Sequence, residues 1–287
     1  MLPPTFVLAV GAPKTGTTWL YSYLNGLPFA DFGIKKEYHI FDAIHVPSCE
    51  FFKPALDNRD SPPANGFEAK KRQREQLLHG FYSDPENYFD YFAGLLIGDI
   101  SLTGDVTPTY MLLPQGVFQS IRDGFARRNI AVKVVLFMRD PVARMISLAK
   151  MSKKLGMSSG RRFDKTSPLA EIIADLLAVP GMRATFDYPA AINKLRKVFA
   201  DEEVFIGFYE NLFKLHHFQQ LCRFLNVPCN PDWLAKKVNA SVESPEMRVS
   251  PEYRQQLRLQ FNDVYQNMTQ LYPGNLIADL WQPLNPL

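Results

Sequence analysis

Long hydrophobic runs are missing from this chain. Its apolar stretches, such as residues 6–10 and 134–138, are far shorter than the ~18 residues that a membrane-spanning helix needs. The sequence therefore predicts no membrane span. Residues 1–5 carry no basic side chain ahead of the first apolar run, so we also expect no classical secretory signal and a cytoplasmic protein.

Cysteine is scarce as well. The three cysteines, Cys49, Cys222 and Cys229, are an odd number, too sparse for a disulfide scaffold and without the paired spacing of a zinc site. We expect reduced thiols and no metal site.

The chain has little excess charge of either sign. It carries 32 Lys and Arg against 29 Asp and Glu, a formal net charge of +3, which argues against a nucleic-acid partner. Any anion site must be local. The hydrophobic content of 46% excludes disorder as the main state, and 287 residues suit one hydrophobic core. We predict a single domain over residues 1–287.

Short apolar runs alternate with helical patterns along the chain. The pattern predicts strands at residues 6–10, 131–138 and 204–208, with further extended segments at 35–42, 95–100 and 104–110. It predicts helices from Thr17, over 67–79 and 114–128, from Pro141, and over 168–177, 189–199, 210–225 and 251–271. Residues 43–66 and 156–166 are expected to be loops. This alternation indicates an α/β fold with a central parallel sheet flanked by helices.

A polar loop joins the first predicted strand to the first helix. It reads Gly11-Ala12-Pro13-Lys14-Thr15-Gly16-Thr17-Thr18-Trp19. Backbone N–H groups and the helix dipole concentrate positive potential at such a position, which favours a bound phosphate. A plain turn is the alternative, but the lysine and the two threonines argue against it. The loop is not a Walker A motif, because Lys14 precedes Gly16 instead of following it.

Arg139 follows the strand at residues 131–138, and Ser147 lies about two helical turns further on. An arginine at a strand's carboxyl end forms charge-assisted bonds to phosphate. Taken alone, Arg139 would more often form a surface ion pair with Asp140. Three more segments complete the motif set: Lys36-Glu37-Tyr38-His39-Ile40-Phe41-Asp42, Gly104-Asp105-Val106-Thr107-Pro108-Thr109-Tyr110 and Phe208-Tyr209-Glu210-Asn211-Leu212.

These motifs, in this order, resemble those of sulfotransferases that use 3′-phosphoadenosine 5′-phosphosulfate (PAPS). The first loop resembles the family's Pro-Lys-Ser/Thr-Gly-Thr-Thr phosphosulfate loop. The segment at residues 36–42 resembles the Lys-Glu-x-His-Phe-Phe-Asp stretch of the heparan sulfate type, with Ile40 in place of one aromatic residue. The resemblance implies a three-layer, P-loop-NTPase-like fold, PAPS as the sulfuryl donor and 3′,5′-adenosine bisphosphate (PAP) as the product, with no required metal.

The resemblance also implies roles for individual residues. The 5′-phosphosulfate would lie on Lys14, Thr15, Gly16, Thr17 and Thr18, and the 3′-phosphate on Arg139 and Ser147. Tyr209 would lie near the adenine, and Arg248, in the segment Ser244-Pro245-Glu246-Met247-Arg248, would be a further cofactor contact. Trp19 would either stack on adenine or pack in the core.

Glu37 would be the general base, and Lys14 would stabilise the leaving phosphate. His39 would orient a reactant or pack in the core. Val106 stands where the glycan-modifying members have a lysine.

The expected reaction is in-line transfer of a sulfuryl group to a hydroxyl or amine. Two alternatives stay open: a Mg²⁺-dependent P-loop kinase or NTPase, and a non-catalytic module that binds a 3′-phosphoadenosine nucleotide. The acceptor could be a small molecule, a glycan or a lipid, with loops 43–66 and 156–166 shaping its pocket. The nearly balanced charge makes a long polyanionic glycan a weaker candidate.

Overall fold

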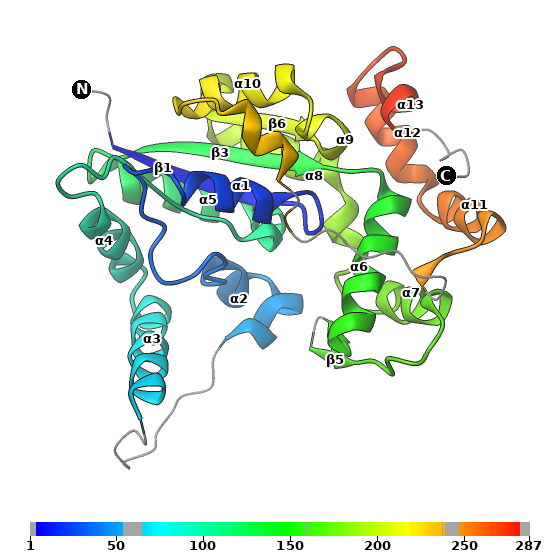
Figure 1. Cartoon of the computed structure of the whole chain (residues 1–287), viewed down its shortest axis with the longest axis horizontal. Coiled ribbons are helices and arrows are strands. Elements are labelled where there is room, and N and C mark those ends of the chain that lie inside the picture. Colours follow the sequence, from blue (N-terminus) through cyan, green and yellow to red (C-terminus); the bar gives the residue numbers. More distant parts are fainter. Residues whose placement is uncertain (1–3, 54–64, 159, 237, 239–246, 282–287) are drawn as a thin grey trace.

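The computed structural model describes residues 4–53, 65–158, 160–236, 238 and 247–281. Its centre is a parallel four-stranded sheet in the order β2-β1-β3-β6, with helices on both faces (Figure 1). The strands are β1 (Thr5–Gly11), β2 (Leu102–Asp105), β3 (Ala131–Met138) and β6 (Val204–Phe208). The predicted α/β fold, a central parallel sheet between two helical layers, is confirmed.

Successive side chains of the central strands belong to two separate hydrophobic clusters. In β1, Phe6, Leu8 and Val10 join the larger cluster, while Val7 and Ala9 join the smaller one. Successive side chains of a strand point to opposite faces of its sheet. Because both faces are covered, β1 and β3 are apolar almost without interruption.

The helices form the outer layers (Figure 1). The smaller cluster is completed by α1 (Thr17–Leu24) and α10 (Leu215–Leu225). The larger one is completed by α4 (Pro85–Leu95), α5 (Gln115–Ala126), α8 (Tyr188–Val198) and others. Beyond the carboxyl ends of the strands lie α6 (Pro141–Leu155), α7 (Leu169–Leu177), α11 (Pro251–Gln260), α12 (Asn262–Leu271) and α13 (Leu276–Leu280).

The remaining elements are short, except α3 (Gly66–Ser83). They are α2 (Phe41–His45), α9 (Tyr209–Leu212), the hairpin strands β4 (Met157–Ser158) and β5 (Arg161–Arg162), and the 3-10 helices η1 (Pro47–Phe52), η2 (Pro108–Leu112), η3 (Arg183–Phe186), η4 (Asp201–Glu203) and η5 (Pro231–Ala235).

Several predicted segments differ from the structure. The expected extended segment at residues 35–42 is irregular and enters α2 at Phe41, because its backbone turns at His39, where φ is +56°. Residues 95–100, which were expected to be extended, form the end of α4 and a turn at Gly98, where φ is +60°. The strand in this region is β2, which begins at Leu102. Only residues 104 and 105 of the segment 104–110 are strand, since Pro108 begins η2.

The predicted loops and helices are also revised. The loop at residues 43–66 contains the end of α2 and all of η1, and its residues 54–64 lie outside the described residues. The loop at 156–166 contains the β4–β5 hairpin. The helices expected over 210–225 and 251–271 are each divided in two, at Phe213 and at Phe261. The unpredicted α4 begins with Asp84 capping the N–H of Glu86 and Pro85 in its first turn.

The described residues contain neither a candidate membrane span nor a candidate metal cluster. No helix in these ranges is long and apolar enough to cross a membrane. Within the same ranges, no group of three or more His, Cys, Asp or Glu side chains could hold a metal ion. The three cysteines are free thiols.

Candidate functional site

A cleft of about 470 Å³ draws its lining from the β1–α1 loop, the carboxyl ends of β3 and β6, and α6. β1 pairs with β2 on one side and with β3 on the other. The chain therefore changes direction across the sheet at β1, and α/β sheets bind ligands outside the carboxyl ends of their strands at such a switch point.

The β1–α1 loop is held in a shape that leaves the start of α1 uncapped. The hydroxyl of Thr15 donates to the carbonyl of Ala12 at 2.6 Å, and the N–H of Ala12 donates to the carbonyl of Phe137 in β3 at 2.6 Å. Gly16 is the N-cap of α1, with φ of +91° and no side-chain cap. The N-terminal N–H groups of α1 thus have no capping side chain and can bind an anion.

Cations converge on this loop. Arg139 donates to the carbonyl of Lys14 at 3.1 Å, and its guanidinium lies 4.0 Å from the centre of the Tyr209 ring. The ammonium of Lys14 lies 3.5 Å from the sulfur of Met151. Burial lowers the pKa of Lys14, and the nearby charges of Arg139 and Lys36 lower it further. A bound anion would relieve this repulsion.

Most of the predicted cofactor residues line the cleft: Lys14, Gly16, Thr17, Thr18, Trp19, Arg139, Ser147 and Tyr209. Thr15 does not, because its side chain is fully buried beneath the loop. Arg248 is exposed and is not part of the lining, and residues 244–246 of its segment lie outside the described residues.

Trp19 contributes to both the core and the cleft. Its side chain is 2% exposed and packs edge-on against Phe213 and Phe218. The indole N–H has no hydrogen-bond partner among the described groups. The core-packing interpretation therefore describes most of this side chain, and stacking on adenine stays a prediction.

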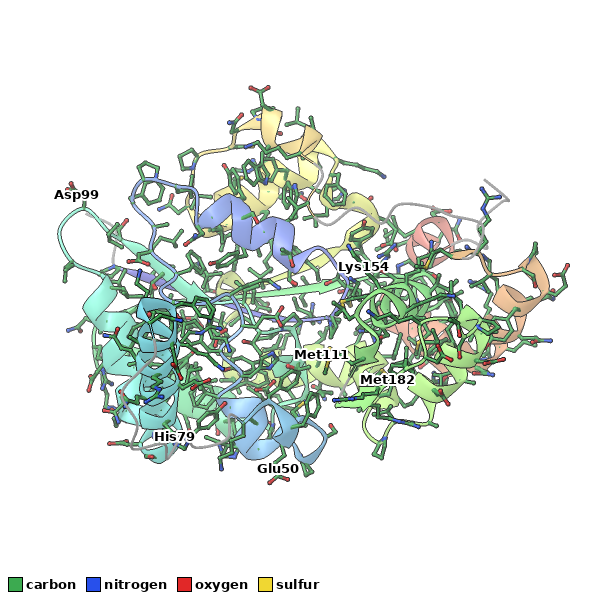
Figure 2. The ribbon with its side chains drawn as sticks, turned by 60° about the horizontal axis from the view of Figure 1, so that its bottom comes forward. Glu50, His79, Asp99, Met111, Lys154 and Met182 are labelled. Carbon is green, nitrogen blue, oxygen red and sulfur yellow. The ribbon has the colours of Figure 1, made fainter. Side chains whose placement is uncertain are left out.

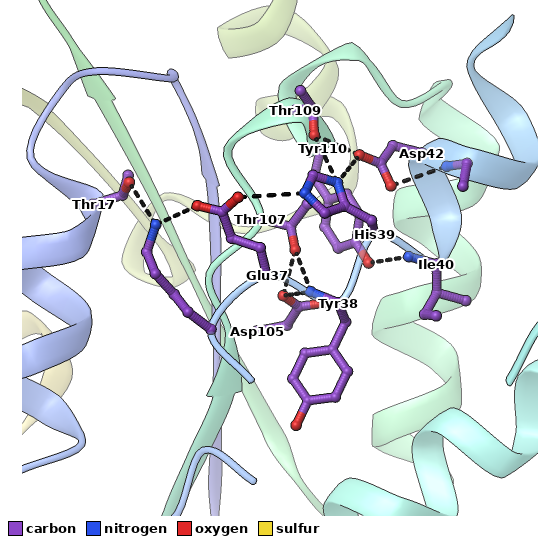
Figure 3. Close-up of polar contacts among 12 residues, drawn as sticks. Thr17, Glu37, Tyr38, His39, Ile40, Asp42, Asp105, Thr107, Thr109 and Tyr110 are labelled. Carbon is purple, nitrogen blue, oxygen red and sulfur yellow. Dashed lines mark hydrogen bonds and ion pairs between the residues drawn. The ribbon is translucent and has the colours of Figure 1, made fainter. Parts of the chain in front are cut away.

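Glu37 and His39 also line the cleft and belong to a chain of polar contacts (Figure 3). One oxygen of Glu37 pairs with the ammonium of Lys36, and the other lies 3.3 Å from Nε2 of His39. Nδ1 of His39 lies 2.7 Å from a carboxylate oxygen of Asp42. Thr109, from η2, donates to the same oxygen of Asp42.

These contacts shift the titration of both groups. Burial alone would raise the pKa of Glu37, but the hydrogen bond with His39 and the charge of Lys36 outweigh it and lower that pKa to about 2. Burial alone would lower the pKa of His39, but its hydrogen bonds to the carboxylates of Asp42 and Glu37 raise it. The arrangement is an anionic Glu37 beside an imidazole that readily holds a second proton.

Four residues of the site were not predicted from the sequence: Lys36, Asp42, Thr109 and Arg144. Lys36 also lies 3.4 Å from the Thr17 hydroxyl. Arg144 is 2% exposed, donates to the carbonyls of Pro13 and Thr185, and stacks 3.5 Å above the ring of Phe186. Lys36, Asp42 and Thr109 lie inside the quoted motifs, and Arg144 lies between Arg139 and Ser147, so proximity to motif residues is the available signal.

Comparison with solved structures relates the fold to known proteins. The chain is similar to a crystal structure of a sulfotransferase from Alicyclobacillus acidocaldarius, with a TM-score of 0.62, 21% identity, and coverage of 96% of this chain and 98% of that one. It also aligns with a sulfotransferase domain from the curacin biosynthetic pathway, with a TM-score of 0.48, 17% identity and coverage of 86% and 83%.

A third structure, the sulfotransferase STF9 from Mycobacterium avium, aligns with a TM-score of 0.45, 14% identity and coverage of 91% and 77%. No protein-family model matches the chain, and no curated protein matches it. The first of the three structures establishes that the chain has the sulfotransferase fold.

Proposed function

We propose that this protein is a sulfotransferase that moves a sulfuryl group from PAPS to a hydroxyl acceptor and releases PAP. One observation carries the proposal. Lys14 and the uncapped start of α1 face the same cleft as the carboxylate of Glu37. Sulfuryl transfer needs a cationic group at the leaving oxygen and a base at the acceptor, and this cleft offers both.

The donor fits the residues that are present. Lys14, Lys36 and Arg139 bring three cations to one cleft, and after burial the charges of Arg139 and Lys36 are further causes of the lowered pKa of Lys14. A molecule with a 5′-phosphosulfate and a 3′-phosphate would supply the missing negative charge. Lys14 and Thr17 would hold the first group, and Arg139 with Ser147 the second. When bound, the donor supplies an activated sulfuryl group on its 5′-phosphate.

The protein's part in the reaction is to move one proton and hold one developing charge. Glu37 takes the proton of the acceptor hydroxyl as the new O–S bond forms. Lys14 and the N–H groups at the start of α1 stabilise the phosphate oxygen as its bond to sulfur breaks. His39, held by Asp42 at 2.7 Å, fixes the orientation of Glu37. A sulfuryl group carries less charge than a terminal phosphoryl group, so side-chain cations suffice in this proposal.

Lys36 would couple donor binding to the strength of the base. Its ammonium pairs with Glu37 and lies 3.4 Å from the Thr17 hydroxyl, at the start of α1. An anion beside Thr17 competes for this ammonium. Because Lys36 helps to lower the pKa of Glu37, drawing it away makes Glu37 a stronger base only when the donor is in place.

Two substitutions test the assignment. We expect Glu37→Gln to reduce transfer by about 10²- to 10⁴-fold, the usual contribution of a general base, with undiminished affinity for PAP, because Lys36 no longer pairs with a carboxylate at this position. Lys14→Ala should abolish transfer and weaken PAP binding. The measurements are sulfate transfer from labelled PAPS to a panel of alcohols, phenols and sugars, and calorimetry with PAP.

The matched controls are Glu202→Gln and Lys154→Ala, which replace exposed side chains outside the lining of the cleft. Near-normal turnover in Glu37→Gln would refute the assignment of the base. Mg²⁺-dependent turnover of ATP would instead favour a kinase or NTPase. PAP binding with no transfer to any acceptor would favour a non-catalytic nucleotide-binding module.

A further inference from the structure

Beyond Lys14 and Glu37, the cleft is lined by large apolar side chains. We call this part the apolar half, and its members are Phe51, Phe52, Leu148, Met151, Leu155, Met157 and Met182. They come from η1, from α6, from the β4–β5 hairpin and from the turn before η3. Glu50 of η1 and Met182 are both labelled in Figure 2, and these segments are far apart in the sequence, so the apolar half is assembled from separate parts of the chain.

The wall formed by α6 begins at the reacting centre. Ser147, Met151 and Leu155 are spaced four residues apart on α6 and therefore share one face of the helix. The Met151 sulfur lies 3.5 Å from the ammonium of Lys14. An acceptor hydroxyl placed between Glu37 and Lys14 would thus put the rest of its molecule against Met151 and Leu155.

The facing wall is aromatic. The ring of Phe52 stacks on the imidazole of His39, with 3.6 Å between centroids and 8° between planes. Phe51 packs on Phe52, with 4.2 Å between centroids. A Cβ added to Gly160 would lie 3.4 Å from the Phe51 ring, so the β4–β5 hairpin reaches η1 across the mouth of the cleft.

The apolar half is exposed to water at its mouth. Phe51, Leu155 and Met157 are 45%, 57% and 51% exposed. Clustered apolar side chains of this size at the opening of a cleft mark a ligand-binding surface, because covering them with an apolar ligand is favourable.

The charges of the described lining do not suit a polyanion. Its cations are Lys14, Lys36, Arg139, Arg144 and, when protonated, His39, which lies between the carboxylates of Asp42 and Glu37. Arg144 is bound to backbone carbonyls, Lys36 pairs with Glu37, and Lys14 and Arg139 face the proposed donor. Among these described lining residues, no further cation faces the apolar half.

We propose that the acceptor is an uncharged hydroxyl on an apolar body, an alkyl chain or an aromatic ring, and not a sulfated glycan. This inference rests on the proposed sulfotransferase activity. Glu37 and Lys14 would engage the hydroxyl end, and the apolar half would bind the rest of the acceptor.

The test uses the full chain, PAPS and linear alcohols from 1-butanol to 1-decanol. We expect kcat/KM to rise about fourfold for each added methylene until the apolar half is filled, because each buried methylene contributes to binding. A heparan sulfate oligosaccharide and glucose should be poor acceptors. Calorimetry of the same alcohols with the PAP-bound protein should show affinity that rises with chain length.

A charged residue at the mouth should remove this preference. Leu155→Asp is expected to lower kcat/KM for 1-octanol at least tenfold with unchanged PAP affinity, and Leu155→Met should retain it. Leu259→Asp is the matched control, because Leu259 is 71% exposed on α11 and is not part of the lining.

The outcomes separate this inference from the proposed function. Preferred transfer to the oligosaccharide, or alcohol binding that is independent of chain length, overturns the apolar acceptor and leaves a sulfotransferase. Chain-length-dependent binding without transfer to any acceptor supports the apolar half and overturns the proposed activity.

Discussion

At the scale of single residues, His39 lies between two carboxylates. Its Nδ1 atom is 2.7 Å from Asp42, and its Nε2 atom is 3.3 Å from Glu37. The Asp42 side chain is fully buried, so its charge acts on the imidazole with little screening by water. Asp42 therefore does more than fix the ring, because it also favours the protonated form of His39.

We expect Asp42→Asn to lower the pKa of His39, because the substitution removes the strongest hydrogen bond that favours the protonated ring. The measurement is an NMR titration of the imidazole protons, with the His39 signal assigned from a His39→Gln spectrum. Sulfate transfer should fall as well, since Glu37 loses an oriented partner.

Asp99→Asn is the control, because Asp99 lies in an exposed turn remote from η1 (Figure 2). An unchanged titration of His39 in Asp42→Asn would show that Asp42 does not act on the ring through its charge.

At the scale of elements, the β1–α1 loop depends on Gly16. Its φ of +91° lies in the left-handed region, and a Cβ there would lie 2.5 Å from a methyl carbon of Leu212 in α9. Alanine at this position would strain the backbone and push α1 away from the segment that carries Tyr209.

We expect Gly16→Ala to lower the free energy of unfolding by ~1–3 kcal/mol and to weaken PAP binding more than tenfold. Denaturant titration and calorimetry measure the two effects. Gly94→Ala is the matched control, because Gly94 lies in α4 with no atom near its missing Cβ, so that change should stabilise the protein by ~0.5–1 kcal/mol. Normal PAP binding by Gly16→Ala would contradict the proposed role of the loop.

The elements differ in how well the sequence predicts them. β3 and β6 match their predicted bounds, because short runs rich in bulky and β-branched residues favour a strand. β2 carries no such signal. Its Gly104 is required by packing, since a Cβ there would lie 2.3 Å from the carbonyl oxygen of Val7.

The residues of the candidate site also differ in how well the sequence predicts them. Its motif residues can be read from the sequence because each motif is local. The roles of Arg144 and Asp42 cannot be read in this way, because their partners, the carbonyl of Pro13 and the hydroxyl of Thr109, come from distant segments that only the fold brings together. The loops at 43–66 and 156–166, expected to shape the acceptor pocket, supply Phe51, Phe52 and Met157 of the apolar half, whereas its members from α6 are not predicted from the sequence.

At the scale of the whole molecule, Asp105 joins several segments within the protein. It is fully buried at the end of β2 and accepts hydrogen bonds from the hydroxyl of Thr107 at 2.6 Å and that of Tyr88, in α4, at 3.0 Å. Burial outweighs these donors and raises its pKa to about 6.

This raised pKa makes stability depend on pH. The folded protein holds the Asp105 proton more tightly than the unfolded chain does, so this contribution is complete below pH ~4 and is lost as the pH rises through about 6. Relative to Asp105→Asn, the wild type should lose of the order of 3 kcal/mol of unfolding free energy between pH 4 and 7.

Urea titrations of the two proteins across this pH range measure the difference. The same comparison with Asp99→Asn should give a constant difference, because Asp99 is exposed. Parallel curves for wild type and Asp105→Asn would show that Asp105 titrates alike in the folded and unfolded states.

The order of strands in the sheet also has a consequence for biosynthesis. β1 is a central strand, yet its neighbour β3 follows it by about 126 residues, as the pairing of Thr5 with Ala131 shows. A ribosome that adds about 5–20 residues per second needs roughly 6–25 s to make that interval. During this time the edge of β1 that pairs with β3 keeps its N–H and C=O groups unpaired on the nascent chain. We therefore expect β1 to be the segment that chaperones protect during synthesis.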